Sequence, residues 1–380
     1  MRAGHGGRVG RFQRELRSAV APRAARDLLG TGATRHVLDG PRWRRATRGF
    51  YVPTAEVALT PTQRILDAAS ALPPGAVIGG WAAAFVQGVD LMDGLDDHTL
   101  RPRPVPVHLP PGLHRRDSAQ LRYHQAREEV ASVVVAGLRV TSAVRTAVDL
   151  ARWAPDVTEA VVALDLLLAA GLVTPAELVA GVEGAGRSRG VVGARRAVAL
   201  ATTGARSPWE SRLRMAYVLN LGYPQPLVNP TVLDASGAVV GIPDLLDEEA
   251  GLVLEYDGAS WTTAARRGGH RDVDQHREDN AREELLERTG LFVTRVDRAD
   301  LVRHRTQLLH RLRAARTHAL ARDRTRDRWR VAPREKEVLP LVEASRAARP
   351  PSRGRRDVRA RSPRPRGAGS PPPGGPSPRR

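Results

Sequence analysis

Two apolar runs lie near residue 250 and are separated by a short acidic turn. Each run has a carboxylate next to one of its ends. Residues 239–261 read VVGIPDLLDEEAGLVLEYDGASW, which sets Asp244, Glu255 and Asp257 on either side of the turn. A carboxylate at the end of a buried strand is unfavourable unless a cation or hydrogen-bond donors compensate its charge. The segment therefore predicts two strands whose acids need a common partner, and a metal ion is one such partner.

Pairing residues 238–257 as an antiparallel hairpin brings these acids toward one site. Asp244 then lies near the end of one strand and Glu255 near the end of the other, while alternation places Glu255 and Asp257 on the same face. Clustered carboxylates repel one another unless they are protonated or neutralised by a cation. Oxygen-only ligation favours Mg²⁺ or Mn²⁺. The alternative is that Asp244 and Asp257 simply end their strands as turn residues.

Charge is distributed unevenly along a chain of 380 residues with a formal net charge of +19. Residues 1–50 carry 12 basic and 3 acidic side chains, residues 51–300 carry 25 and 32, and residues 301–380 carry 23 and 6. Only one basic residue is a lysine, Lys336, so the arginine content also reflects the codon bias of a GC-rich genome. Basic ends around a slightly acidic middle favour a protein that holds phosphates with its extremities.

The chain contains no cysteine, which excludes disulfides and thiolate metal sites. Its first twenty residues are arginine-rich and lack the apolar run of a signal peptide, and no later segment offers about 18 uninterrupted apolar residues. We therefore expect a cytoplasmic protein that does not span a membrane.

Residues 1–53 are expected to form a winged helix-turn-helix. Helices are predicted at 11–20, 23–29 and 34–38, followed by a hairpin that turns at Arg48-Gly49. In such a domain a short helix enters the major groove and the wing lies on the DNA backbone. Arg35 and His36 are assigned to bases, and Arg42, Arg44, Arg45 and Arg48 are assigned to phosphates. A small helical cap with a solvated basic hairpin is the alternative interpretation.

The rest of the chain divides into three parts. Residues 54–203 indicate a mainly helical middle domain with two strands, at 105–110 and 121–126. Residues 204–318 follow the order helix, three strands, helix, strand, which is typical of a mixed sheet flanked by helices. Residues 331–380 are rich in Arg, Pro, Gly and Ser, and we expect them to be disordered because they cannot bury enough apolar surface. The predicted fold class is therefore α/β, or α+β overall.

Residues 207–301 resemble the PD-(D/E)XK nuclease superfamily, close to the branch that is similar to very-short-patch-repair endonucleases. The resemblance rests on SPWES, on the PD that ends at Asp244, on the EYDG that begins at Glu255, and on TRVDRADL. It implies a restriction-endonuclease-like fold and Mg²⁺- or Mn²⁺-dependent hydrolysis at Asp244, Glu255 and Asp257. An acid on the first helix often joins this site, which makes Glu210 a candidate, although SPWE also reads as a capping box.

Two departures from the superfamily pattern leave the activity open. Asp257 stands where the usual motif has a lysine, and no lysine lies within the domain. Trp261 stands near the place where relatives carry a histidine. His270 and His276 are therefore the candidate general bases, since a histidine titrates near neutral pH.

Three further segments, WRRATRGFYVP, IGGWAAAFVQGV and GLRVTSAVRTAVDLAR, resemble an actinobacterial group whose N-terminal part is similar to the winged-helix domain of abortive-infection type IV antitoxins. Together the two resemblances imply a DNA-interacting protein that acts as a divalent-metal-dependent DNA endonuclease. A non-catalytic DNA-binding regulator of the antitoxin type is the alternative, and an RNA nuclease stays open. Neither a toxin partner nor an oligomeric state follows from the sequence.

Overall fold

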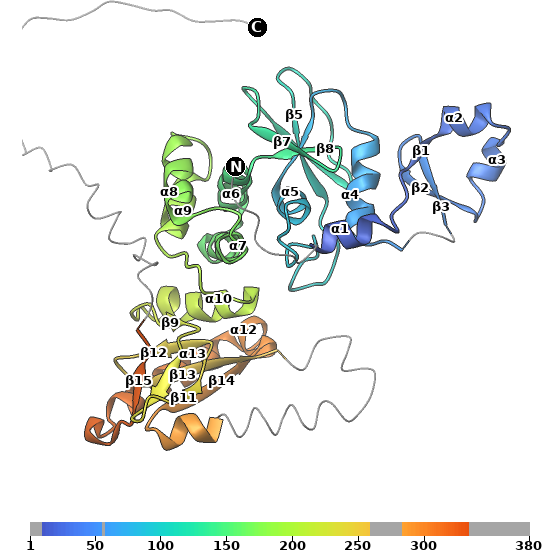
Figure 1. Cartoon of the computed structure of the whole chain (residues 1–380). Coiled ribbons are helices and arrows are strands. Elements are labelled where there is room, and N and C mark those ends of the chain that lie inside the picture. Colours follow the sequence, from blue (N-terminus) through green and yellow to red (C-terminus); the bar gives the residue numbers. More distant parts are fainter. Residues whose placement is uncertain (1–9, 55–57, 259–282, 334–380) are drawn as a thin grey trace, which may run out of the picture.

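The computed structural model describes residues 10–54, 58–258 and 283–333, and within them the chain is a mixed α/β protein with four sheets (Figure 1). The predicted α/β class is thereby confirmed. In this described part no helix is long and apolar enough to cross a membrane. Nearly all of the predicted tail, from residue 334 onward, lies outside the described residues.

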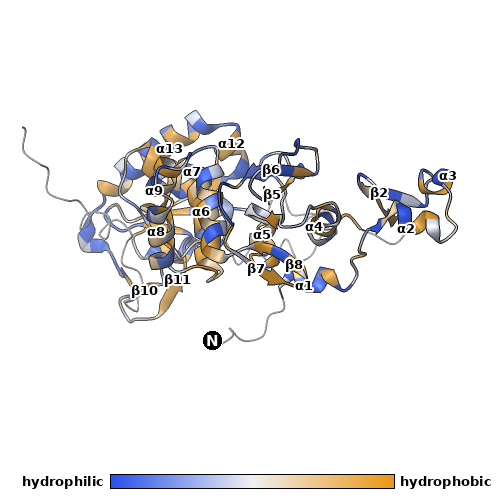
Figure 2. Cartoon of the chain, turned by 90° about the horizontal axis from the view of Figure 1, so that it is seen from above, coloured by the Kyte–Doolittle hydropathy of each residue, from blue (hydrophilic) through white to orange (hydrophobic). Residues whose placement is uncertain are grey.

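Three short strands and two helices make up a small N-terminal unit. Its elements are β1 (Arg23–Ala24), α2 (Ala25–Gly30), α3 (Arg35–Leu38), β2 (Trp43–Thr47) and β3 (Phe50–Pro53). The strands pair antiparallel in the order β1-β3-β2. The hairpin turns through Gly49 at a φ of +81°, which favours glycine, so the predicted turn is confirmed. Figures 1 and 2 both show this unit projecting from the rest of the molecule.

The first helix, α1 (Arg11–Leu16), packs with the middle of the molecule and not with this N-terminal unit. It contacts α4 (Pro61–Ser70) and α5 (Gly80–Val86). Phe12 is 1% exposed and lies edge-on to Phe85, with ring centroids 6.2 Å apart. The helix is shorter than the predicted span 11–20 and joins the core of the next region.

A five-stranded sheet forms the centre of the middle region, in the order β6-β5-β4-β8-β7. Its strands are β4 (Val77–Ile78), β5 (Val105–Leu109), β6 (Leu121–Gln125), β7 (Ser132–Val135) and β8 (Leu138–Thr141). β5 and β6 confirm the two predicted strands, whereas the expectation of a mainly helical region missed the other three. β7 and β8 are short and join through Ala136 and Gly137, both at positive φ, and so brief a hairpin leaves little sequence pattern.

Four helices follow this sheet and share one large apolar core with it. They are α6 (Ala143–Trp153), α7 (Val157–Ala169), α8 (Pro175–Gly184) and α9 (Val191–Val198). These helices agree with the helical content expected for residues 54–203. Met215 of α10 (Pro208–Met215) lies in the same core, so the C-terminal region is packed against the middle region.

The C-terminal region is built on a four-stranded sheet in the order β14-β13-β12-β9. Its elements are β9 (Leu227–Val228), β10 (Val232–Asp234), β11 (Val239–Gly241), β12 (Leu245–Asp247), β13 (Leu252–Asp257), β14 (Phe292–Asp297), α12 (Arg298–Val302), α13 (Arg305–Leu320) and β15 (Trp329–Val331). One core, which includes Leu245 and Leu254, lies between this sheet and helices α10 and α13. The other core, which includes Leu246 and Val253, faces the small sheet β11-β10-β15.

Two predicted strands of this region are interrupted, and each half joins a different sheet. The first of the three strands expected after the first helix of residues 204–318 breaks at Asn229-Pro230, where Asn229 has a φ of +46°. The second of these strands breaks before Asp244. Both breaks contain a proline, which has no N–H to donate to a strand ladder. Of the predicted second helix, only residues 283–288 are described, and these are helical.

Strand β15 extends the C-terminal unit beyond its predicted limit at residue 318. Val331 pairs with Val232, and Trp329 pairs with Asp234. We expect a chain that ends at residue 327 to melt several degrees below one that ends at residue 333, because losing this strand removes about 2 kcal/mol of apolar burial. Thermal unfolding monitored by circular dichroism measures the difference. Equal melting temperatures would show that β15 contributes nothing to stability.

Candidate functional site

The hairpin of β12 and β13 brings Asp244 and Glu255 opposite each other. Leu245 pairs with Leu254 in the antiparallel register, so Asp244, the residue before β12, faces Glu255 across the strands. Oδ2 of Asp244 accepts a hydrogen bond from the backbone N of Tyr256 at 2.8 Å. Glu255 is 9% exposed. The predicted hairpin is confirmed for residues 245–254, with both acids at its open end, whereas residues 239–241 belong to another sheet.

Asp257 lies on the same face of β13 as Glu255. Val253 belongs to the core beneath the small sheet, whereas Leu252 and Leu254 belong to the core beneath the helices. Because side chains alternate along a strand, Glu255 and Asp257 project on the side of Val253. Asp257 ends the strand and is half-buried. Three carboxylates therefore lie at one end of one sheet face.

Strand β14 places an arginine beside these acids that the sequence analysis did not single out. β13 and β14 run parallel, with Arg295 paired to Glu255 and Asp297 paired to Asp257. Arg295 Nη2 lies 2.6 Å from Oε2 of Glu283. An arginine stays protonated, so it lowers the repulsion among neighbouring carboxylates at any ordinary pH. A parallel alignment of the two six-residue strands would have identified Arg295 from the sequence.

Asp297, the acid aligned with Asp257, has a structural role at the start of α12. Its Oδ1 accepts a hydrogen bond from the backbone N of Asp300 at 2.8 Å, and Oδ2 of Asp300 accepts one from the backbone N of Asp297 at 3.2 Å. This reciprocal pair is a capping box. Asp297 is therefore not a candidate for catalysis.

Glu210 is buried and turned toward the sheet, and only half of the predicted capping box forms. The Ser207 hydroxyl accepts a hydrogen bond from the backbone N of Glu210 at 3.2 Å. Oε2 of Glu210 instead accepts from the backbone N of Arg206 at 3.0 Å and from Nδ2 of Asn229 at 2.9 Å. The backbone N of Asn229 in turn donates to the carbonyl of Asp244 at 2.9 Å. Asn229, which the sequence analysis missed, thus connects Glu210 to the carboxylate hairpin.

Thr174 and Glu177 provide the comparison within the same chain, since TPAE at 174–177 has the same cap, proline and glutamate spacing as SPWE at 207–210. There the glutamate returns to the cap residue, with Oε2 of Glu177 2.9 Å from the backbone N of Thr174. The different orientation of Glu210 is therefore not a requirement of the capping motif. It is a property of the position of Glu210 beside Asn229.

The opposite face of β13 packs against Trp209 of α10, and the Trp209 ring in turn contacts His98 of the middle region. The ring of Tyr256 stacks on that of Trp209, with centroids 5.8 Å apart and planes 8° from parallel. Burial raises the pKa of Tyr256 to about 12, so its hydroxyl stays protonated near neutral pH. Arg298 Nη2 donates to the carbonyls of Asp97 and His98 at 2.8 and 2.6 Å. These contacts hold the end of β13 in place relative to the middle region.

The metal site remains a prediction. Among the described residues, no group of three or more His, Cys, Asp or Glu side chains is placed to hold a metal ion. His270 and His276, the candidate bases, and Trp261 lie outside the described residues. Asp244, Glu255 and Asp257 have the hard carboxylate oxygens that an oxygen-ligated cation needs, but in this structure they do not converge into such a group.

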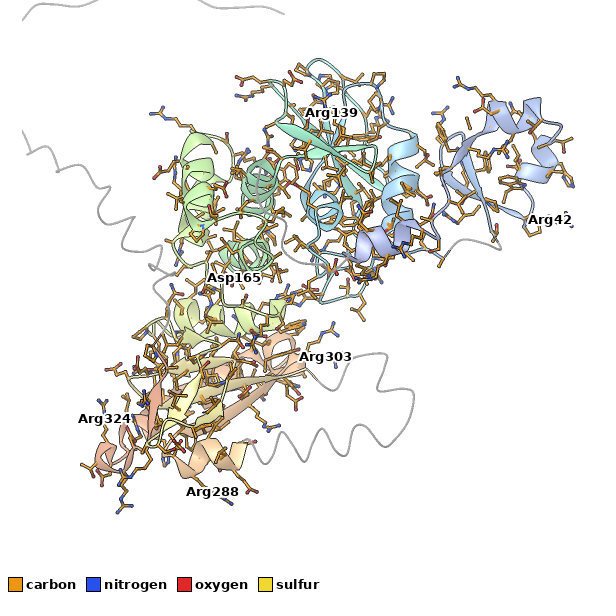
Figure 3. The ribbon with its side chains drawn as sticks, viewed as in Figure 1. Arg42, Arg139, Asp165, Arg288, Arg303 and Arg324 are labelled. Carbon is orange, nitrogen blue, oxygen red and sulfur yellow. The ribbon has the colours of Figure 1, made fainter. Side chains whose placement is uncertain are left out.

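The candidate DNA-binding side chains of the N-terminal unit are mostly exposed. Those at the surface are Arg35, His36, Arg42, Arg45 and Arg48. Figure 3 shows Arg42 at the outer edge of this unit. Arg44 differs, because its Nη1 lies 2.7 Å from Oδ2 of the buried Asp67 on α4. Arg44 thus attaches the hairpin to the middle region.

Comparisons with known proteins provide no family for this chain. No protein-family model matches it, and no curated protein matches it. Among solved structures, the RV2827C protein from Mycobacterium tuberculosis has 17% sequence identity and a TM-score of 0.32, over 53% of this chain and 78% of that chain. That similarity is too low to carry an argument about fold or function.

Proposed function

We propose that this protein binds DNA and hydrolyses its phosphodiester bonds with Mg²⁺ or Mn²⁺ held by Asp244, Glu255 and Asp257. The observation that carries the proposal is the register of β12 and β13, which sets Asp244 opposite Glu255 with Asp257 on the same face. A divalent cation there would activate a water molecule and stabilise the leaving oxygen. The chain's own contribution is to hold the three carboxylates at one end of the sheet.

The order of elements supports a PD-(D/E)XK interpretation of this region. Helix α10 precedes three antiparallel strands of one sheet, β9, β12 and β13, and β14 then joins parallel to β13. In the proposed site Arg295, which lies beside Glu255 and also pairs with Glu283, supplies a fixed positive charge where the usual lysine is absent. As a permanent cation it stabilises charge on a phosphate oxygen but is a poor general base.

The test of this function is a nicking assay with the purified full chain. Supercoiled plasmid is incubated with millimolar Mg²⁺ or Mn²⁺, with and without chelator, and a parallel reaction contains single-stranded RNA of similar length. Metal-dependent conversion of plasmid to open circles supports the proposal. Cleavage of RNA alone would make the protein an RNA nuclease, and no cleavage of either substrate would favour the regulator.

The second candidate function is a non-catalytic DNA-binding regulator with a degenerate nuclease-like domain. The observation that favours it is Asp257 at the position of the usual lysine, since a third acid adds repulsion in place of the positive charge of a lysine. In this function the N-terminal unit, interpreted as a winged helix, binds the DNA. The exposed arginines of its hairpin are then the main DNA contacts.

Replacing Arg42, Arg45 and Arg48 together with glutamine is expected to weaken binding to duplex DNA. Three lost phosphate contacts lower the magnitude of the log-log salt slope by about 3. Fluorescence anisotropy with a labelled duplex at several salt concentrations measures the change. Arg44→Gln is the control. It should lower the melting temperature, because it breaks the ion pair with Asp67, and leave the salt slope nearly unchanged. An unchanged slope in the triple variant would contradict the winged-helix assignment.

A further inference from the structure

Helix α13 and the two residues before it form a basic segment without carboxylates. From Arg303 to Arg322 the sequence RHRTQLLHRLRAARTHALAR contains no aspartate or glutamate. The inner face of the helix is apolar, and Leu308, Leu312 and Ala319 are buried in the core against the sheet. The outer face therefore carries the cations, and nothing on the helix itself neutralises them.

Several arginines of this segment already have partners in the fold. Arg316 pairs with Asp247, and Arg322 pairs with Asp327. Arg311 pairs with Asp300, and Nη2 of Arg305 donates to Oδ1 of Asn220. These side chains have structural roles, so they are unavailable to a ligand. The remaining cations of the segment have to be considered separately.

Arg303 and Arg313 are the exposed cations without such partners. Both are exposed, and no side chain of the described residues forms a hydrogen bond or ion pair with either guanidinium. His304 and His310 are exposed in the same way. We call Arg303, His310 and Arg313, together with the intervening Thr306, the α13 stripe.

Three members of the α13 stripe lie on one side of the helix, because Thr306, His310 and Arg313 recur at spacings of four and three residues. Arg303 precedes the helix and lies in the turn between α12 and α13. Seven residues of helix span about 10 Å. Successive phosphates of one DNA strand rise by about 3.4 Å along the axis, so the helical part of the stripe covers roughly three steps of the backbone.

The stripe begins one short helix beyond the end of β14. Arg303 follows α12, which starts directly after Asp297 at the end of that strand. In Figure 3, Arg303 lies at the edge of the C-terminal region nearer the N-terminal unit, whereas Arg288 and Arg324 lie farther from that unit. Helices α12 and α13 cover the sheet face of Leu252 and Leu254, whereas Glu255 and Asp257 project on the face of Val253, so the stripe is a surface separate from the carboxylates.

We propose that the α13 stripe binds the sugar–phosphate backbone of duplex DNA. The inference rests on the proposed function only in taking DNA as the polyanion, and it applies whether or not the carboxylates are catalytic. Arginine is suited to this role, because its planar guanidinium forms two hydrogen bonds with one phosphate. The C-terminal region is then a DNA-binding surface in its own right and not merely a scaffold.

The experiment compares two double variants of the full chain by fluorescence anisotropy with a labelled 20-base-pair duplex in chelator. Arg303→Gln with Arg313→Gln removes two charges from the stripe. Arg187→Gln with Arg196→Gln removes two exposed, unpartnered charges near α8 and α9. We expect the stripe variant to lower the magnitude of the salt slope by about 2 and to weaken binding several-fold, because two phosphate contacts are lost. The control variant should stay within twofold of the wild type.

The outcomes separate this inference from the proposed function. Equal losses in the two double variants would overturn the inference, since the effect would then be one of net charge alone. An unchanged stripe variant beside a weakened hairpin variant would also overturn it, while DNA binding itself would stand. If the wild-type chain bound no duplex, both the stripe and the DNA-binding part of the proposed function would fall. Cleavage cannot affect these binding measurements, because the chelator removes the divalent metal.

Discussion

Replacing Glu255 with glutamine is expected to abolish both metal-dependent stabilisation and cleavage of DNA. The substitution keeps the size of the side chain and removes one of the charges that would hold the metal. Wild-type protein at a metal concentration a hundred times the Kd should gain about 2.7 kcal/mol of stability by mass action. The variant should gain almost none, and its cleavage should fall by more than the roughly 10–100-fold typical of outer-shell changes.

Glu248→Gln is the matched control for this prediction. Glu248 lies in the acidic turn between β12 and β13, is exposed, and has the same charge to lose. It should bind metal and cleave like the wild type. Thermal shift with and without Mn²⁺, together with plasmid nicking, measures both properties in the three proteins.

Each pattern of results assigns a different function. Cleavage that persists in Glu255→Gln would refute the assigned site. A metal-dependent shift without cleavage in the wild type would indicate a site that keeps its ligands but has lost the chemistry of the missing lysine. Metal that changes the stability of none of the three proteins would favour the non-catalytic regulator.

The hairpin that carries Asp244 and Glu255 was predictable because the information it needs is local. Apolar alternation, one short acidic turn and the strand period of two residues place the two acids. Arg295 was not predictable in the same way. It reaches Glu255 only through parallel pairing of two strands about 40 residues apart, a register that no turn between them specifies.

The orientation of Arg44 shows a second limit of sequence reasoning. Arg44 and Arg45 are neighbours on β2, so alternation puts them on opposite faces. Which of the two faces solvent depends on where α4 lies, since α4 carries Asp67. The same dependence on distant segments explains why α1 was assigned to the N-terminal unit, although Phe12 packs in the middle core.

Buried charge at the junction between the middle and C-terminal regions leads to the second large effect. Arg214 of α10 and Asp165 of α7 form an ion pair at 2.7 Å, and both side chains are fully buried. Figure 3 shows Asp165 where these two helices meet. Asp165 also accepts hydrogen bonds from the Ser211 hydroxyl at 2.6 Å and from the backbone N of Thr202 at 2.7 Å.

Replacing Asp165 with leucine is expected to destabilise the protein by about 3–5 kcal/mol, because it leaves the charge of Arg214 buried and uncompensated. Adding Arg214→Met in the same chain should recover most of that loss, since an apolar pair of similar volume requires no compensating charge. Urea denaturation gives both free energies of unfolding, and the m-values show whether one transition has become two.

Glu284→Gln is the control for this pair, because Glu284 and Arg288 form an ion pair with both side chains largely exposed. Its loss should change stability by no more than about 1 kcal/mol. If Asp165→Leu and the double variant were equally destabilised, packing at the junction and not charge compensation would hold the two regions together. If instead the single variant unfolded in two steps, the C-terminal region would be the less stable unit, and Asp165 would be the residue that joins its folding to that of the middle region.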